Sequence, residues 1–563
     1  MDRRTLLFFV ISATILLVYQ ELVIGPQMPA PTTEVVEQTS SPATSPDEDL
    51  PVTVSEQAPL PRVAVESEPQ ARASAGEPRE DQRVEAQPVG QRISIETARY
   101  RATLNTRGGR IESFILKDFR EESTSGSPEL ELIVPAPEIE NPLGIELRGA
   151  RVWSDQTTLY TASQENIRVA AGETGTLTLS AMIGGQPIEK ELTFYGDLYT
   201  IGLTTRVPGS SALPVTLAQD GPDGSPPAVA LTLSRGAKPK EDGTIYEGIS
   251  ALVDGKLEST PREDFEEPQT VSGTIGWAGF EDHYFLTAAA PERADGLRMR
   301  RRGAKALQAG IVTTRNASGP TEINYTLYFG PKDRALLEAA GHQYEKALNL
   351  GWFGPISLLL LDVLQFLHRI FGNWGVDIIL LTVLVKIAFW PLSKKSFDSM
   401  KAMQKLQPEM EKIKEKYADD QQKLSQETME LYKRHKVNPL GGCLPMLLQM
   451  PVFFGLYMLL QNTIELRHAP FALWITDLAA PERLMIAGYG IPVLTLLLGA
   501  SMFLQQKMTP SAADPTQQRI MMLMPVVFTF MFINFPAGLT LYWLTQNILT
   551  IGQQWLNLRS QDT

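Results

Sequence analysis

The chain has 563 residues and a formal net charge of −13, and a chain of this length is expected to hold more than one structural unit. The acidic balance argues against a nucleic-acid-binding protein, which needs basic side chains to neutralise phosphates. The single cysteine, Cys443, excludes an intrachain disulfide and a multi-cysteine metal site, and the five histidines lack metal-ligand spacing.

The charge is divided unevenly along the chain. Residues 26–354 carry a net charge of −16, whereas residues 355–563 carry +3. The mean hydropathy of −0.10 is therefore an average over two different kinds of sequence. This division predicts an acidic, polar half outside the membrane, followed by a slightly basic, apolar half.

The N-terminal residues contain an apolar run at 5–19, for which a cleaved signal peptide and a retained anchor are the two interpretations. No small-x-small cleavage site follows the run directly, so we expect residues 1–25 to be a transmembrane anchor. Arg3 and Arg4 place its N-terminus in the cytoplasm. Residues 26–92 are rich in Pro, Glu, Ser and Thr, and we expect a disordered linker there.

Residues 93–332 have the texture of an all-β domain. Short runs of alternating apolar and polar residues are separated by Gly, Asp and Pro, a pattern that predicts an antiparallel β-sandwich. Because the domain follows an anchor whose N-terminus is inside, we expect it in the periplasm. The clearest runs are residues 100–106, 110–116, 175–183, 190–196, 198–207 and 323–329.

Connecting helices are predicted in residues 333–371. Residues 333–350 have a helical composition, and residues 355–371 form an apolar helix with one polar face. We expect the latter to lie at the membrane interface, with burial in a globular core as the alternative. The polar residues that share the face are Asp362, Gln365, His368 and Arg369.

Five strongly apolar stretches follow, each close to the roughly 20 residues that a membrane span needs. Together with the anchor they predict six transmembrane helices, the second within residues 372–392 and the third to sixth within 439–556. Residues 536–538 are predicted to form a tight turn, and residues 557–563 a short cytoplasmic tail. The stretches are Trp374–Leu392, Cys443–Leu460, Leu484–Leu504, Ile520–Phe535 and Leu539–Trp555.

The segment 393–438 between the second and third spans is the most basic loop, with 11 Lys or Arg and 8 Asp or Glu residues. The positive-inside rule places it in the cytoplasm, as does counting spans from the anchor. Apolar residues recur there at three- and four-residue steps, among them Met400, Met403, Leu406 and Met410. We expect a cytoplasmic helical hairpin, with a solvated linker as the alternative.

Lys386 is the unusual residue of the second span, because an ionisable side chain inside a membrane is costly. A lysine near a helix end can instead extend to the headgroups, so both interpretations stay open. A Ser–Lys hydrolase is not expected, since Ser393 lies two helical turns away, roughly 10.5 Å of rise. No nucleotide-binding motif is present, and we expect no cofactor and no catalytic residue.

Several long motifs resemble the YidC membrane protein insertase family, which is related to the Oxa and Alb proteins. VNPLGGCLPMLLQMPVFFGLYMLL resembles its third transmembrane helix, and GNWGVDIILLTVLVKIAFWPL its second. LRHAPFALWITDL and FPAGLTLYWLTQNILTIGQQW are similarly specific. The large β domain, with GWAGFEDHYF, points to the Gram-negative branch. The fold class is thus a polytopic α-helical membrane protein with a five-helix insertase core and a large periplasmic β domain.

The resemblance implies a non-enzymatic insertase and chaperone of the inner membrane, acting alone or with the Sec translocon. Its partners would be nascent membrane proteins and the lipid bilayer. Ribosome binding would be weak, because the chain ends nine residues after Gln554 with one basic residue, Arg559, where many family members have a long basic tail.

The resemblance also implies a hydrophilic groove that is open to the cytoplasm and the lipid. Lys386 occupies the position where the family usually has arginine, so the charge is kept but the planar guanidinium is not. No metal site is implied. The candidate groove and substrate contacts are Lys386, Thr382, Gln449, Met450, Pro451, Phe528, Tyr542, Trp543 and Gln546.

Two other functions are alternatives to insertion. A small-anion transporter or channel would use the same cavity, but the sequence shows no inverted repeats. A sugar-binding or sugar-epimerising β domain would need a paired His and carboxylate set, which the sequence does not show.

Overall fold

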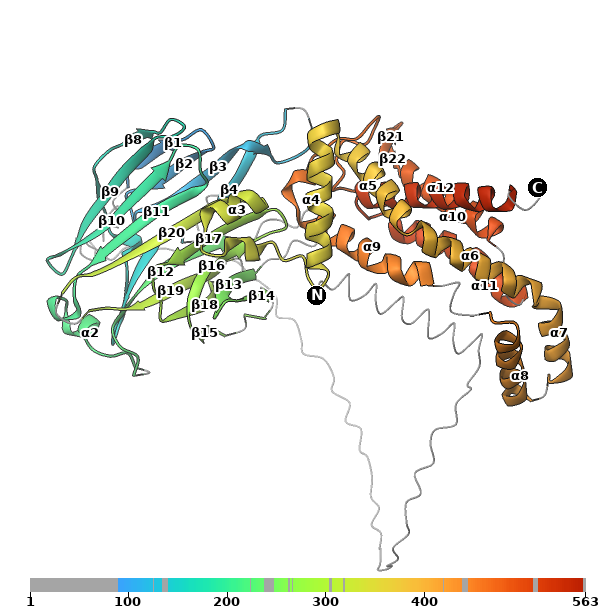
Figure 1. Cartoon of the computed structure of the whole chain (residues 1–563). Helices are drawn as coiled ribbons and strands as arrows, with labels where there is room; N and C mark the ends of the chain where they lie inside the picture. The colour runs from blue at the N-terminus through green and yellow to red at the C-terminus, as the bar shows by residue number, and fades with distance from the viewer. Residues whose placement is uncertain are drawn as a thin grey trace, which may run out of the picture. The chain divides into compact units, whose positions relative to one another are not determined.

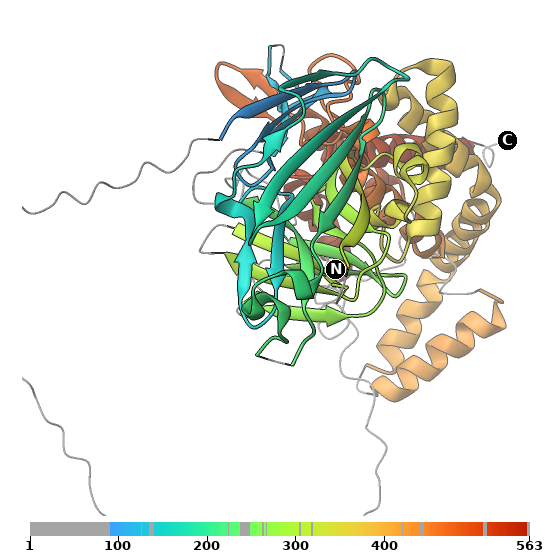
Figure 2. The same ribbon diagram turned by 90° about the vertical axis from the view of Figure 1, so that its left-hand side faces the viewer.

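A computed structural model describes residues 90–559, except 125, 134–139, 223, 237–247, 262–263, 266, 303–305, 317–318, 419, 438–443 and 510–514. Figures 1 and 2 show a β-rich part followed by a helical part. The predicted anchor at 1–25 and almost all of the predicted linker at 26–92 lie outside the described residues, as does Cys443.

Three sheets make up the described β-rich part. The five-stranded sheet has the order β4-β3-β2-β1-β8, the nine-stranded sheet β14-β13-β16-β17-β20-β11-β10-β9-β7, and the six-stranded sheet β15-β18-β19-β12-β5-β6. Neighbouring strands pair antiparallel except β1 and β8, which pair parallel. The bounds are β1 Arg92–Glu96, β2 Tyr100–Asn105, β3 Arg110–Arg120, β4 Glu129–Ile133, β5 Gly144–Arg148, β6 Val152–Ser154, β7 Thr161–Ala162, β8 Asn166–Arg168, β9 Thr174–Ile183, β10 Gln186–Tyr195, β11 Thr200–Val207, β12 Ala228–Gly236, β13 Gly248–Val253, β14 Lys256–Pro261, β15 Gln269–Ser272, β16 Ile275–Glu281, β17 Phe285–Pro291, β18 Gly296–Arg302, β19 Ala306–Thr314 and β20 Thr321–Pro331.

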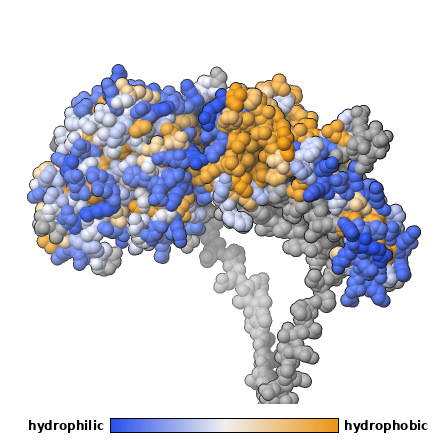
Figure 3. Space-filling view, in the orientation of Figure 1, coloured by the Kyte–Doolittle hydropathy of each residue, from blue (hydrophilic) through white to orange (hydrophobic). Residues whose placement is uncertain are grey.

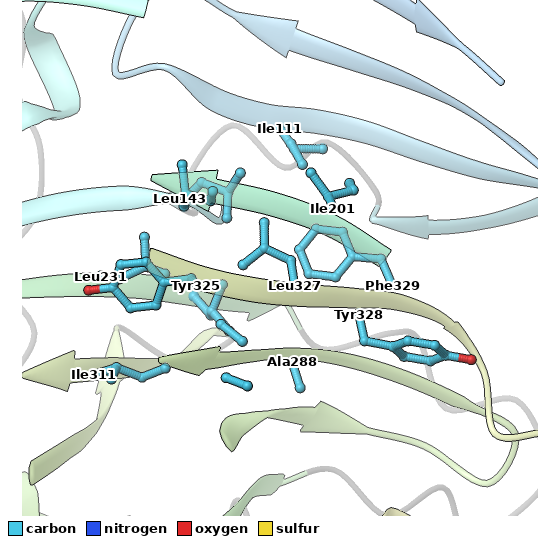
Figure 4. Close-up of a cluster of buried hydrophobic side chains, with 14 of the residues drawn as sticks. Ile111, Leu143, Ile201, Leu231, Ala288, Ile311, Tyr325, Leu327, Tyr328 and Phe329 are labelled. Atoms are coloured by element: carbon cyan, nitrogen blue, oxygen red, sulfur yellow. The ribbon is translucent and has the colours of Figure 1, made fainter. Parts of the chain in front are cut away.

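The hydrophobic core lies between these sheets because their strands alternate in hydropathy. Ile323, Tyr325 and Leu327 are buried at every second position of β20, the period at which side chains of a strand face one side. Figure 4 shows Leu327 and Phe329 beside Ile201 of the adjacent strand β11. The alternation therefore builds the β-rich domain that the sequence predicts.

A buried charged cluster joins the sheets in the middle of this domain. The Lys190 ammonium on β10 is fully buried and donates hydrogen bonds to the carbonyls of Gly108 (2.7 Å) and Leu143 (2.6 Å) and to the Asp155 carboxylate (2.7 Å). The Arg110 guanidinium on β3 donates to the other oxygen of Asp155 at 2.9 Å. Burial lowers the pKa of Lys190 to about 8, so the group is still mostly charged at neutral pH and keeps its donors.

The segment 333–350 is helical only in part. Helix α3 spans Arg334–Ala340 and ends at Gly341, whose positive φ of 74° terminates it, and a separate 3₁₀ turn, η5, spans Tyr344–Ala347. The segment of helical composition therefore contains one short α-helix and one 3₁₀ turn. Helix α4 follows at Gly354–Phe371.

The helical part contains eight further helices among the described residues. Their bounds are α5 Trp374–Ala388, α6 Trp390–Lys405, α7 Gln407–Lys416, α8 Gln421–Arg434, α9 Leu444–Asn462, α10 Val493–Met508, α11 Pro515–Phe532 and α12 Ala537–Arg559. In Figure 3 the apolar residues gather on the helical part, whereas the β-rich part and α7–α8 show mostly polar residues.

The predicted second span, Trp374–Leu392, is broken. Helix α5 ends at Ala388, and the chain bends by 62° before α6. The proline at 391 has no amide hydrogen, and its ring would clash with the carbonyl four residues earlier, which accounts for the break.

The predicted span Leu484–Leu504 is also wrong in its first part. Strands β21 (Leu484–Ile486) and β22 (Tyr489–Ile491) form a hairpin, and α10 begins only at Val493. The predicted turn at 536–538 is displaced as well, because α12 already begins at Ala537.

By length and hydropathy, one described helix, α4, is long and apolar enough to cross a membrane, and the bent pair α5–α6 would make a second. Helices α5 and α10 have 15 and 16 residues, fewer than the roughly 20 that a straight span needs. The six predicted spans therefore stay a prediction, and α4, which the sequence assigns to the interface, also meets the criteria for a span.

Helices α7 and α8 lie side by side as a helical hairpin (Figure 2). The Tyr432 hydroxyl of α8 contacts the Met410 sulfur of α7 at 3.0 Å, and His435 lies 3.5 Å from the Glu409 carboxylate. The turn between them ends at Asp420, whose side chain accepts the amide of Lys423 and caps α8.

The loop between α9 and α10 fixes the first turns of two helices. The carbonyls of Leu478 and Ala480 accept the amides of Gly538 (2.9 Å) and Ala537 (2.8 Å) at the start of α12. The buried Glu482 carboxylate accepts the amide of Leu494 (2.8 Å) at the start of α10. A carboxylate at this end is favourable because helix N-termini leave amides unpaired and carry partial positive charge.

We predict that Lys190→Met lowers the free energy of unfolding of the β-rich domain by about 3–5 kcal/mol, because it leaves the Gly108 and Leu143 carbonyls without a donor and removes one partner of a buried carboxylate. Urea-dependent proteolysis of the full chain measures this. Arg206→Met, which breaks exposed ion pairs, is the control and should cost at most about 1 kcal/mol. If the two substitutions lowered the free energy of unfolding equally, the buried cluster around Lys190 would not be a main source of stability.

Candidate functional site

Lys386 lies in the last turn of α5 and is only 6% exposed. Its ammonium donates a hydrogen bond of 2.8 Å to the Thr550 hydroxyl of α12, and that hydroxyl donates in turn to the carbonyl of Gln546 at 2.7 Å. Among the residues that the structure describes, no carboxylate pairs with Lys386. The side chain is therefore turned into the helical part, where neutral dipoles stabilise its charge.

A small cavity adjoins the ammonium group. Its volume of about 10 Å³ is close to the space that one water molecule needs, so it is far smaller than a groove that admits a peptide. The lining residues come from four helices and the break between two of them: Val385, Lys386, Phe389, Leu392, Ser393, Gln449 and Gln546.

Polar side chains of α9 and α12 continue from this cavity. The Gln546 amide donates to the Gln449 carbonyl oxygen at 3.2 Å, and the Gln449 amide donates to the Tyr542 hydroxyl at 3.2 Å. Tyr542 and Gln546 are four residues apart, so they lie on one face of α12. The structure therefore brings together four of the residues named from the sequence, Lys386, Gln449, Tyr542 and Gln546.

The other sequence candidates lie away from the cavity. The Thr382 hydroxyl donates to the Ile378 carbonyl one turn earlier, at 2.6 Å, so it is used within its own helix. Phe528 and Trp543 belong to an aromatic cluster, with their ring centroids 6.2 Å apart. Met450 packs against the hydrophobic core of the helices, and Pro451 lies inside α9. None of these five residues lines the cavity.

Two further residues of α12 were not identified from the sequence. Thr550 is the hydrogen-bond partner of Lys386. Gln553 is 1% exposed, and among the described residues neither polar atom of its side chain has a hydrogen-bond partner. Thr550 lies four residues after Gln546, and Gln553 lies three residues after Thr550, so all three share one helix face. This spacing is the sequence signal that could have found them.

Ser393 lines the same cavity as Lys386, because the bend between α5 and α6 changes the direction of the chain. No hydrogen bond joins the two side chains. The arrangement therefore offers no activated nucleophile. It can hold a cation against a hydroxyl group, beside a small cavity that Gln449 and Gln546 also line.

Comparison with known proteins covers both parts of the chain. Residues 92–363 match the family described as the YidC periplasmic domain, and residues 366–563 match the family described as 60Kd inner membrane protein.

The membrane protein insertase YidC of Nitratidesulfovibrio vulgaris (strain DSM 19637 / Miyazaki F) is 40% identical over 498 residues, which cover 86% of this chain and 88% of that protein. The membrane protein insertase YidC of Maridesulfovibrio salexigens is 37% identical, with 99% of both chains covered. The crystal structure of an active YidC insertase with its first transmembrane domain resolved is 17% identical, with a TM-score of 0.36 over 83% of this chain and 95% of that one. With both family matches and relatives this similar over nearly their whole length, the chain belongs to the YidC family of membrane protein insertases.

Proposed function

We propose that this protein inserts hydrophobic segments of newly made proteins into the inner membrane and assists their folding. The observation that carries the proposal is the family match over both parts of the chain, residues 92–363 and 366–563, together with relatives named as membrane protein insertases. Insertion of this kind makes and breaks no covalent bond, so the function is not enzymatic. The β-rich domain is the periplasmic part of the protein.

The proposed topology has six spans, with both termini in the cytoplasm. The basic residues of α6, α7 and α8 support a cytoplasmic position for the segment 393–438, since cytoplasmic loops retain Lys and Arg. The domain limits predicted from the sequence belong to this proposal, from the anchor at 1–25 to the tail at 557–563. The exposed apolar side chains of α10 and α11, such as Leu496 and Phe530, would face lipid.

The proposed mechanism uses Lys386 as an attracting charge. A polar or acidic segment of a substrate would enter beside Lys386, and Gln449, Tyr542 and Gln546 would reduce its desolvation cost through hydrogen bonds. The following apolar segment would then partition into lipid, which is favourable because apolar surface leaves water. This route requires the 10 Å³ cavity to widen when substrate arrives.

The remaining candidate contacts would guide the apolar segment. Phe528 of α11 and Trp543 of α12 form an aromatic surface, and Met450 and Pro451 lie on α9, which packs against α12. Thr382 supports α5 one turn before Lys386. Cooperation with the Sec translocon and weak contact with ribosomes are part of the proposal.

Depletion of the protein from its native host should block insertion of a small single-span substrate. Protease added from the periplasmic side would then no longer cleave the translocated end of the substrate. A secreted soluble protein serves as the control. Unchanged insertion would refute the proposed function. Unchanged insertion with a lost anion flux would instead favour a transporter or channel.

Substitutions at Lys386 test the charge. We expect Lys386→Arg to support insertion, Lys386→Ala to lower it, and Lys386→Glu to be the most damaging, because a negative charge repels an acidic segment and is itself costly in the membrane. Complementation of a depleted strain measures this at matched expression. Lys507→Ala removes an exposed lysine of α10 and should have no effect. If the three Lys386 variants complement equally, the charge is dispensable.

Gln553→Leu should separate stability from function. Within the described part of the chain the buried Gln553 amide has no hydrogen-bond partner, so replacing it by an apolar side chain should raise the free energy of unfolding by about 1–3 kcal/mol. If the polar face of α12 serves substrate, insertion should nevertheless fall. The neighbouring Gln554→Leu is the control, since its amide donates to Thr509 at 3.0 Å and its loss should lower stability. A stabilised variant with full insertion activity would show that Gln553 has no part in the site.

A further inference from the structure

The hairpin β21–β22 is a well-defined element between α9 and α10. Leu484 pairs with Ile491, Met485 with Gly490, and Ile486 with Tyr489. The two turn residues, Ala487 and Gly488, have φ of 52° and 85°, the backbone conformation of the tight turns that suit the twist of paired strands. One residue, Pro492, separates the hairpin from α10, so the hairpin is attached directly to the start of that helix.

The surface of this hairpin is apolar and exposed. Met485, Ile486 and Tyr489 are 65%, 51% and 77% exposed. Residues 484–491 contain no charged side chain, and the Tyr489 hydroxyl is their one polar side-chain group. Packing within the described part of the chain does not explain such a concentration of apolar side chains at the tip of a loop. An exposed apolar patch of this kind marks a contact surface.

The hairpin continues an apolar surface that α10 already presents. Leu496 and Leu497, in the first turns of α10, are also largely exposed. Because the chain belongs to a family of membrane proteins and α10 is a proposed span, the expected partner of those leucines is lipid. The hairpin is joined to the first turn of α10 (Figure 1). In the proposed topology this end of α10 lies at the membrane boundary, so the apolar tip of the hairpin would be held next to that boundary.

Charged groups lie at the base of the hairpin and not at its tip. Arg483 precedes β21 and donates to the Glu482 carbonyl at 2.8 Å, and the Glu482 carboxylate caps α10 through the Leu494 amide. This contact keeps the base of the hairpin fixed to α10. An apolar tip with a basic residue behind it matches the order of acyl chains and phosphate headgroups at a membrane surface.

The depth of the tip is limited by the backbone. A two-stranded hairpin leaves the outer amides and carbonyls of both strands without a partner in the sheet, and each such group costs several kcal/mol in hydrocarbon. Tyrosine is favoured at the membrane–water interface, where its ring is apolar and its hydroxyl is hydrated. The hairpin therefore suits the boundary between headgroups and acyl chains better than the bilayer centre.

We propose that the β21–β22 hairpin is a lipid-interface anchor, with Met485, Ile486 and Tyr489 inserted among the headgroups and upper acyl chains at the end of α10. In the proposed topology this is the periplasmic leaflet. The anchor would fix the depth and tilt of α10, and its existence depends on α10 lying in the membrane but not on insertion activity.

Site-specific fluorescence on the full chain in vesicles tests the proposal. An environment-sensitive dye is attached at position 485 through Met485→Cys in a Cys443→Ser background, in vesicles of phosphatidylethanolamine and phosphatidylglycerol. We expect blue-shifted emission and quenching by a nitroxide near the headgroup, with weaker quenching by a nitroxide at the end of the acyl chain. Met182→Cys, at a methionine of β9 that is 62% exposed in the β-rich domain, is the matched control and should show neither effect.

Three outcomes would overturn the proposal. Emission at 485 equal to that at 182 would place the tip in water. A blue shift without lipid quenching would show that protein covers the tip, and stronger quenching by the deep nitroxide would place it in the bilayer centre.

A second variant distinguishes anchoring by the side chains of the hairpin from a local effect of the dye. Ile486→Asp combined with Tyr489→Asp should release the tip, so that emission at position 485 shifts to the red and headgroup quenching is lost. Retained quenching in this variant would contradict anchoring by the two side chains. Insertion of a single-span substrate, measured in parallel, separates loss of the anchor from loss of the proposed function.

Discussion

An ammonium group buried among apolar helices is the constraint on which the helical part of this protein depends. Insertion of a lysine at the centre of a membrane helix costs about 2.5–3.5 kcal/mol, and its three N–H groups need acceptors. The acceptor that Lys386 has in the structure is the Thr550 hydroxyl, which is itself bonded to the Gln546 carbonyl. The charge on α5 therefore requires α12 to present polar residues at a helical spacing towards it.

Polar residues of α12 face Lys386 only if the helix has a fixed orientation about its own axis, because successive residues of a helix are 100° apart around that axis. The loop between α9 and α10 supplies the restraint. Its carbonyls at Leu478 and Ala480 hold the first amides of α12, while Glu482 holds those of α10. Residues far from Lys386 thus set the orientation of Thr550 and Gln546, and a hairpin seated in lipid would hold the same loop at a fixed depth.

Sequence patterns predict those parts of this structure in which periodicity and burial agree. Alternation in residues 323–329 predicts a strand, and Lys386, Gln449, Tyr542 and Gln546 come together as polar residues in apolar helices would. Hydropathy failed over residues 484–491, because an apolar run has the same composition in a hairpin as in a span, and only Gly488 and Gly490 signal the turn. The proline at 391 was a visible signal for the bend after Ala388, and Gln553 was visible by its spacing.

The hydrogen-bond partner of Lys386 is a neutral hydroxyl group, and this bears on how far the charge of Lys386 acts. A carboxylate beside the ammonium would repay more of its desolvation, but the pair would carry no net charge, and its field would fall off steeply with distance. The dipole of the Thr550 hydroxyl stabilises the cation while leaving its full charge. At low dielectric such a charge acts over many ångströms, so the protein retains an attraction that an ion pair would cancel. The site is proposed to attract an acidic segment out of water. A lysine whose charge is not neutralised by a carboxylate attracts such a segment more strongly than an ion pair would.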